Sequence, residues 1–259
     1  MINDYEMGRH MFGDFSCIIR QMCAYAAEHR YIPADPFASI KIKWGKDLFI
    51  EEAKPDEALV FFKDEVPTMI KHCWNQYYAG RCTQQIFTPL AIIFCFYTGL
   101  RVSELAVLRF SDIHRSGVIV QRMLDDDGKV VARTKGGKPR TVPLTSEARK
   151  VIDEIKRKRL ESGLPIDGYI FAIEAPIRVY NRIKVTIKIY CRDLGFLERS
   201  IHDVRRTWIS KLIDDNVPIK TVMEYAGHKY ASTTYKSYVF SIRRAEEMTA
   251  MLEASMTYA

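Results

Sequence analysis

Apolar residues recur at helical spacing through most of this chain. Near the N-terminus, the residues that could share one helix face are Ile18, Ile19, Met22, Cys23, Tyr25 and Ala26. This helix is expected to stop at Pro33–Pro36, a turn and helix-breaking signal. Because one helix and its flank bury little surface, the segment is expected to end a longer helical domain or to dock on another part.

A second helical region follows residues 51–58, which form a polar, acid-rich linker. One helix should open at Lys63–Glu65. Another should run from about Gln84 to Tyr97 and end at Gly99, because glycine commonly terminates helices. A third helix should begin at Ser103.

Strand patterns are confined to the middle of the chain. Residues 117–123 are rich in β-branched side chains, and residues 130–134 and 140–143 are expected to form two strands joined at Gly136-Gly137. Helical spacing returns after them. The predicted fold class is therefore mainly α with one small antiparallel β-meander.

Composition narrows the choice of partner. The 259 residues allow one or two domains, and 39 Lys and Arg against 32 acids give a formal charge of +7, which favours a polyanionic partner without establishing one. The six cysteines form no C-x-x-C pair and do not cluster with histidines, so neither a metal site nor a disulfide framework is expected. Without a signal-like N-terminus or a membrane-length apolar run, a cytoplasmic location is expected.

Four short motifs, one after another along the chain, carry residues suited to a phosphate group. They are T-G-L-R-V-S-E-L with Arg101 and Glu104, T-K-G-G-K-P-R-T-V-P-L with Lys135, H-D-V-R-R-T with His202 and Arg205, and A-G-H with His228, followed ten residues later by Tyr238. Arginine suits phosphate because its planar fork binds two oxygens at once. A tyrosine beside such a cradle is a competent nucleophile toward phosphorus.

Each motif taken alone has an ordinary explanation. The arginine–glutamate pair could be a surface ion pair worth about a few tenths of a kcal/mol, and H-x-x-R could be an exposed basic helix end. Lys138 is a second candidate hairpin lysine, and Tyr230 and Tyr235 compete with the candidate nucleophile. Ser200 and Asp203 predict a capped helix start, whose N–H groups favour phosphate. These explanations account for each motif separately, but they do not account for the occurrence of all four motifs in this order.

Together the motifs resemble those of the tyrosine recombinases, the phage-integrase-type site-specific recombinases. The resemblance implies the catalytic residues Arg101, Lys135, His202, Arg205, His228 and Tyr238, with Glu104 in support. It also implies strand transfer through a 3′-phosphotyrosyl link, with no cofactor or metal. Ala226 departs from the leucine of the family's L-G-H motif, and Ser237 leaves Tyr238 as the tyrosine in register.

The same resemblance implies an organisation and partners. Residues 1–50 are expected to be the C-terminal part of a helical core-binding domain that clamps DNA, 51–58 a linker, and 59–259 a catalytic domain with a tail from about residue 239. Since typical members carry about twice as much before the linker, an N-terminally truncated integrase of a mobile element is expected. The implied partners are double-stranded DNA and further copies in a homo-tetramer, with the tail packed either in trans or in cis.

Three other functions fit parts of the sequence. The same site residues could relax DNA as a type IB topoisomerase does, and the short N-terminal segment fits a DNA-binding recombinase remnant. A basic all-α scaffold is the third alternative, and salt-sensitive DNA binding would exclude it. The DNA target sequence and the choice among integration, excision, inversion and dimer resolution do not follow from the sequence.

Overall fold

The computed structural model describes residues 9–38, 59–80, 86–173, 175–230, 234 and 242–256. The chain divides into two compact units, Met1–Lys54 and Pro55–Ala259. The predicted linker and Tyr238 lie outside the described residues. Within the described ranges, no helix has both the length and the apolar character needed to cross a membrane.

The N-terminal unit contains the predicted first helix, α1 (Arg9–Glu28), followed by bends and turns through Pro33–Pro36. Its apolar face is largely uncovered within this unit. Ile18, Met22 and Tyr25 are 54%, 61% and 56% exposed. The helix is thus confirmed, and its apolar face contributes little to a core.

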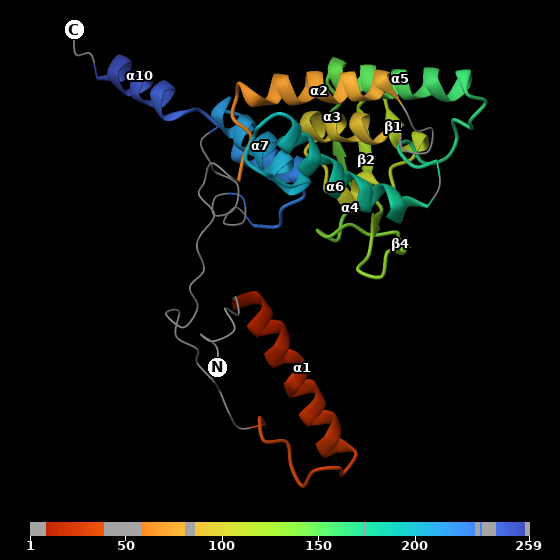
Figure 1. Cartoon of the computed structure of the whole chain (residues 1–259), viewed down its shortest axis with the longest axis vertical. Helices are drawn as coiled ribbons and strands as arrows, with labels where there is room; N and C mark the ends of the chain where they lie inside the picture. The colour runs from red at the N-terminus through yellow and green to blue at the C-terminus, as the bar shows by residue number, and fades with distance from the viewer. Residues whose placement is uncertain are drawn as a thin grey trace. The chain divides into compact units, whose positions relative to one another are not determined.

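The larger unit is built mainly of helices (Figure 1). In chain order they are α2 (Glu65–Ala79), α3 (Thr88–Thr98), α4 (Val102–Leu105), the 3-10 helix η5 (Phe110–Asp112), α5 (Ser146–Glu161), α6 (Pro176–Asp193), α7 (Ile201–Asp214), α8 (Ile219–Ala226) and α10 (Ala245–Ser255). Helix α3 is central, because α2, α5, α6 and α7 all pack against it. The predicted mainly helical fold class is confirmed.

Two small antiparallel sheets complete this unit. One contains β1 (Ile113–His114), β2 (Gly117–Val120) and β5 (Arg140–Val142) in the order β1-β2-β5, and the other pairs β3 (Met123–Leu124) with β4 (Val130–Val131). The predicted single hairpin is therefore wrong, because its two strands belong to different sheets.

Burial explains this strand pairing. Val118 lies opposite Val142, and both are buried, at 0% and 1% exposure. Val130 is 39% exposed and offers no comparable core-facing partner. Pairing β5 with β2 places two apolar side chains together on the face that meets the core, and such cross-strand pairs stabilise a sheet.

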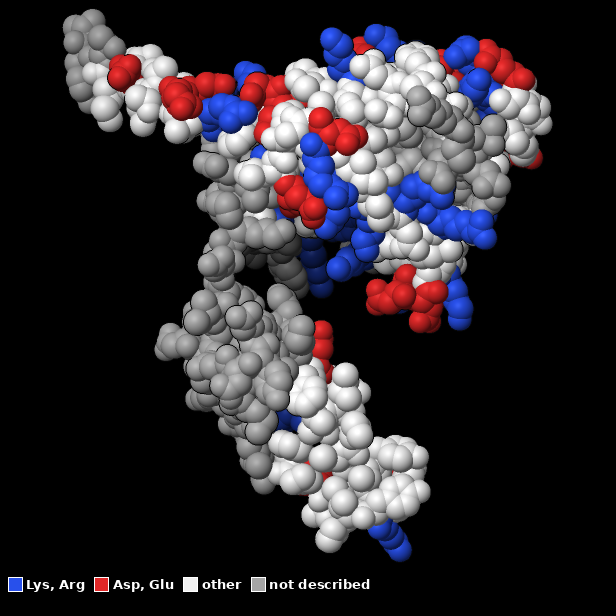
Figure 2. Space-filling model, in the orientation of Figure 1, with Lys and Arg blue, Asp and Glu red and all other residues white. Residues whose placement is uncertain are grey.

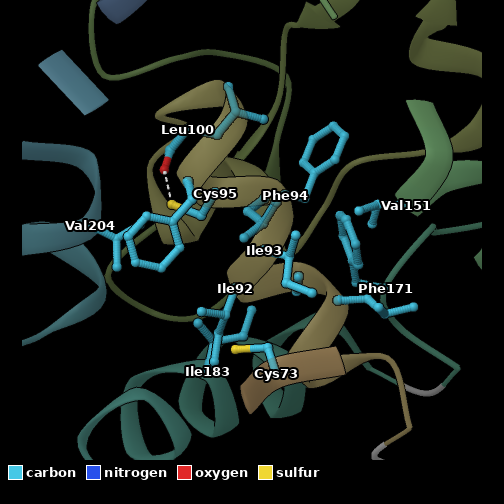
Figure 3. Close-up of a cluster of buried hydrophobic side chains, with 14 of the residues drawn as sticks. Cys73, Ile92, Ile93, Phe94, Cys95, Leu100, Val151, Phe171, Ile183 and Val204 are labelled. Carbon is cyan, nitrogen blue, oxygen red and sulfur yellow. Dashed lines mark hydrogen bonds between the residues drawn. The ribbon is translucent and has the colours of Figure 1, made fainter. Parts of the chain in front are cut away.

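The core surrounds α3, which is apolar on every side (Figure 3). A helix that is hydrophobic all round must be enclosed by other elements. Phe94 packs against Phe171, and Cys95 donates a hydrogen bond to the Leu100 carbonyl at 3.3 Å. Burial raises the pKa of the Cys95 thiol to about 12, so this cysteine is inert as a nucleophile in the folded protein.

Helix α3 ends at Gly99, as predicted, and this glycine adopts a left-handed conformation (φ +60°). A Cβ at this position would lie 2.2 Å from the Trp208 ring of α7. The glycine therefore serves two purposes, since it turns the chain and lets α7 approach α3. The turn sets the position of Arg101, which follows two residues later at the start of α4. The close approach of α7 sets the position of Arg205, which lies on α7.

Residues just before the last helix contact the rest of the larger unit. The buried Ile242 accepts a hydrogen bond from the Lys63 N–H at 2.9 Å, and Arg243 and Arg244 pair with Asp214 and Asp64. The described residues of α10 include none that is buried. The described part of the tail thus forms a helix at Ala245–Ser255 whose apolar side chains are not part of the core.

Candidate active site

A cleft of about 740 Å³ brings together residues from distant motifs. Arg101 enters it from the start of α4, Lys135 from the turn between β4 and β5, and His202 and Arg205 from the first turns of α7. Tyr180 of α6 contributes to its apolar wall. Folding therefore gathers four of the predicted site residues around one cavity.

Arg101 is held at the helix start by its neighbour. It is the N-cap of α4 with extended backbone angles, and its N–H donates to the Glu104 carboxylate at 3.0 Å. Its guanidinium reaches the Glu104 Oε1 atom and the Ala226 carbonyl, both at 3.3 Å. The side chain remains 18% exposed, so part of it stays open to the cleft.

Arg205 is 1% exposed and lies on the first turns of α7. Its two terminal nitrogens donate to the Gly99 carbonyl at 2.6 Å and to the Ala226 carbonyl at 2.5 Å. The predicted cap at the start of α7 is present, because the Asp203 carboxylate accepts hydrogen bonds from both the N–H and the hydroxyl of Ser200. Because Arg101 and Arg205 both donate to the Ala226 carbonyl, the two arginines meet at the end of α8.

His228 follows Gly227, the left-handed cap of α8. Its Nε2 lies 3.0 Å from an Arg205 nitrogen, and its Nδ1 lies 2.9 Å from the Thr234 hydroxyl. A guanidinium can only donate, so Nε2 is the acceptor and the proton of the neutral ring is on Nδ1. This ring is therefore a hydrogen-bonded neighbour of Arg205 rather than a surface histidine.

Both histidines are held in the neutral form. Burial first, and then the charges of Arg205 and Arg101, lower the pKa of His228 to about 3. His202 keeps an exposed edge, yet the partial withdrawal of water, followed by the charges of Arg206 and Arg205, lowers its pKa to about 4. At neutral pH both imidazoles are therefore uncharged, and the positive charge of the cleft comes from its arginines and lysine.

Lys135 lies in the turn that the Gly-rich motif predicted. The Gly137 N–H donates to the Thr134 carbonyl, and the Thr134 hydroxyl donates to the Lys138 carbonyl, at 3.0 and 2.9 Å. A Cβ at Gly136 would lie 3.0 Å from the Gly227 carbonyl, so the turn approaches the end of α8. Among the described residues, the cleft lining includes Lys135 and not Lys138, which favours the former of the two candidates.

Arg140 is a site residue that sequence reasoning missed. It donates two bonds to the Glu104 carboxylate, at 2.9 and 2.7 Å, and one to the Tyr225 carbonyl at 2.8 Å. Burial raises the pKa of Glu104, but hydrogen bonds from Arg140 and the charges of Arg140, Arg205 and Arg101 outweigh it and lower the pKa to about 2. The signal in the sequence was an arginine on the strand next to the Gly-rich turn.

The candidate nucleophile, Tyr238, lies outside the described residues. The nearest described position before it is Thr234, which is fully buried and contacts His228. Tyr230, one of the competing tyrosines, is 59% exposed, and Tyr235 is outside the described residues. The choice of nucleophile therefore remains a prediction from the sequence.

The larger unit packs helices around a buried central helix and has a basic cleft. This fold is also found in solved structures of DNA recombinases. The Tn1549 transposon integrase in complex with transposon right end DNA superposes with a TM-score of 0.65 over 98% of this chain and 81% of that one, at 17% identity. The XerA recombinase superposes with a TM-score of 0.58 over 93% and 83%, also at 17% identity. These similarities establish the fold.

Sequence comparison gives the family. The chain belongs to the phage integrase family, whose pattern matches residues 60–243. It is 29% identical over 247 residues to a XerC-like tyrosine recombinase of Caldanaerobacter subterraneus subsp. tengcongensis, covering 84% of this chain and 59% of that protein. It is 26% identical over 233 residues to a probable integrase/recombinase of Aquifex aeolicus, covering 80% and 70%. The predicted membership of the tyrosine recombinases is confirmed.

The chain is shorter than several of these relatives. It spans 59% of the Caldanaerobacter protein, 46% of a tyrosine recombinase of Pseudothermotoga lettingae and 44% of the XerC recombinase of Xanthomonas axonopodis pv. citri.

Proposed function

We propose that this protein is a site-specific DNA recombinase that breaks and rejoins DNA strands through Tyr238. The observation that carries the proposal is the convergence of Arg101, Lys135, His202 and Arg205 on one cleft in a phage integrase family member. Fixed positive donors at a reacting phosphate supply electrostatic stabilisation, which is usually the largest catalytic contribution.

The cleft residues can be assigned to the steps of a transesterification. The Tyr238 oxygen attacks the scissile phosphorus, a 3′-phosphotyrosyl bond forms, and the bond to the 5′ oxygen breaks. Arg101 and Arg205 stabilise the negative charge on the non-bridging oxygens, and Lys135 gives a proton to the departing 5′ oxygen. His202 accepts the tyrosine proton, which its neutral state at pH 7 permits. Attack by a 5′-hydroxyl of another strand reverses these steps and rejoins the DNA.

His228 has a separate role in this scheme. Its Nε2 accepts a hydrogen bond from Arg205. A bound phosphate places negative charge beside the ring and raises its pKa, because an opposite charge favours the protonated form. The protonated Nε2 then donates to the phosphate, while the Thr234 hydroxyl orients the other nitrogen.

Charge distribution supports double-stranded DNA as the partner. The chain carries a formal charge of +7, and Lys and Arg gather on the lower side of the larger unit in Figure 2, beside the acidic turn that precedes β4. A similar fold in the Tn1549 integrase binds transposon DNA. Phosphate contacts of this kind give affinity that falls steeply with salt.

The domain roles and the assembly are part of the same proposal. Residues 1–50 form part of a DNA clamp, residues 59–259 carry the catalysis, and four copies act on paired sites in the cytoplasm. In α10, Met248, Met251 and Leu252 are 39%, 48% and 54% exposed. This apolar face supports docking of the tail on a neighbouring copy, since none of the described residues of α10 is buried.

Covalent trapping tests the chemistry. Wild-type protein is incubated with nicked duplexes, drawn from DNA flanking its gene and from random sequences, and adducts that resist detergent are recovered and sequenced. The nick lets the short 5′-hydroxyl strand diffuse away, so the adduct accumulates. Adducts are expected from wild type and from Tyr230→Phe and Tyr235→Phe, and none from Tyr238→Phe.

Two results would contradict the proposal. Adducts from the Tyr238→Phe protein would move the nucleophile elsewhere. If the wild-type protein binds DNA in a salt-sensitive way but forms no adduct, the protein is a DNA-binding module and not an enzyme. Tail docking is tested separately, by a protein that ends after Arg244: loss of multi-protomer complexes on DNA with retained cleavage supports exchange, and unchanged assembly opposes it.

A further inference from the structure

Glu104 is a buried carboxylate that faces more positive charge than it can neutralise. It is 1% exposed, and the guanidinium groups of Arg101, Arg140 and Arg205 all lower its pKa. The Arg140 guanidinium donates to both carboxylate oxygens, at 2.9 and 2.7 Å, whereas the Arg101 guanidinium donates to one of them at 3.3 Å. The carboxylate is thus divided unequally between the two arginines.

The position of Arg140 commits it to this carboxylate. Its side chain is 6% exposed, and its Nε donates to the Tyr225 carbonyl at 2.8 Å. A Cβ at Gly227 would lie 3.1 Å from its guanidinium, so α8 closes over it. Among the described residues, the cleft lining includes Arg101 and Arg205 but not Arg140. In this arrangement the donors of Arg140 are used by Glu104 and Tyr225 rather than offered to the cleft.

We propose that Arg140 is a positioning residue that neutralises Glu104 and so leaves the charge of Arg101 available to the scissile phosphate. This inference rests on the proposed strand-transfer function. A buried carboxylate that loses its partner is strongly unfavourable, so it takes the nearest remaining donor. Without Arg140 that donor is Arg101, at 3.3 Å, and a tighter pair would turn its guanidinium away from the cleft.

Single-turnover cleavage of a nicked duplex selected by the wild-type protein tests this compensation. Arg140→Gln is expected to cleave about 10²-fold more slowly, the loss typical of a misplaced catalytic group. Adding Glu104→Gln removes the charge that captures Arg101, so the double variant is expected to recover to within about tenfold of wild type. Arg140→Lys keeps the charge and is expected to lose less than about tenfold.

A matched control distinguishes positioning from general stability. Arg122 also pairs with a buried carboxylate, since one of its terminal nitrogens donates to both oxygens of Asp112 at 2.5 and 2.6 Å, and the described cleft lining does not include it. Arg122→Gln removes a similar ion pair and is expected to leave the cleavage rate within about twofold of wild type at a temperature where the protein is folded. Thermal unfolding of every variant sets that temperature.

DNA binding in a Tyr238→Phe background gives a second readout that needs no cleavage. If Arg101 is withdrawn, the slope of log affinity against log salt should fall by about 0.9, the value for one phosphate contact. Arg101→Gln and Arg140→Gln should show the same fall, and the Glu104→Gln, Arg140→Gln double variant should restore the wild-type slope. Arg122→Gln should leave it unchanged.

The outcomes separate this inference from the proposed function. Absence of a wild-type adduct refutes the strand-transfer proposal, while the salt slopes still decide the role of Arg140. A double variant as slow as Arg140→Gln, with an equally reduced slope, would overturn the inference and leave Arg140 as a structural anchor. If Arg140→Gln does not fold, Arg140→Lys and the double variant decide: a loss of about 10²-fold in both folded proteins contradicts compensation.

Discussion

His228 should make the stability of this protein depend on pH. Its folded-state pKa is about 3, against an ordinary value of 6.5, because of burial and the adjacent Arg205 and Arg101. Between these two values the imidazole takes up a proton in the unfolded chain and not in the folded one. Protonation therefore stabilises the unfolded chain, and the free energy of unfolding falls as the pH falls below 6.5.

The size of the effect follows from the shift. One pKa unit corresponds to about 1.36 kcal/mol, so lowering the pH from 7 to 5 should remove up to about 2 kcal/mol through this residue. Urea unfolding of wild type and His228→Gln at both pH values measures it. The variant has no titrating group there, so its loss between pH 7 and pH 5 should be smaller by that amount.

Other acidic groups titrate in both proteins, so the difference between the two losses isolates His228. Parallel losses in the two proteins would refute the reasoning, and so would an NMR titration that gives the folded histidine a pKa near 6.5. Either result would mean that Arg205 does not donate to a neutral ring.

Three further perturbations test the packing around the site. Gly99→Ala should lower the free energy of unfolding in urea by about 2–4 kcal/mol, because it adds left-handed strain and a clash with Trp208. Gly163→Ala has a similar φ but open space around it, and should lower the free energy of unfolding by about 1 kcal/mol. Arg159 donates to four backbone carbonyls, so Arg159→Met should lower the free energy of unfolding by at least about 3 kcal/mol. A loss under about 1 kcal/mol would show that the carbonyls find other donors. Cys95 should resist a thiol reagent in native protein and react after unfolding, and rapid native labelling would contradict its burial.

Local rules explain why much of the fold could be predicted. Gly99 ends a helix where the sequence predicted a helix stop, and Ser200 begins one with the predicted cap. These signals act within one turn of chain and need no distant partner. The ordered motifs likewise identified the family, since their residue types and spacing are properties of the sequence alone.

Strand pairing and the role of Arg140 could not be predicted in the same way. Residues 130–134 and 140–143 looked like one hairpin, yet the second strand pairs with β2 because Val118 and Val142 share the buried face. Arg140 looked like one more basic residue of a hairpin. Its importance depends on Glu104, 36 positions away, and on the end of α8.

The sequence by itself determined the family and the helix ends marked by a cap or a glycine, and it predicted a set of residues able to handle a phosphate. Those properties depend on side-chain chemistry and on spacing over a few residues. Only the tertiary structure decided which arginine neutralises Glu104, which tautomer His228 adopts and which hairpin lysine lines the cleft. These outcomes depend on burial and on distances between segments far apart in the chain, where charge and desolvation compete.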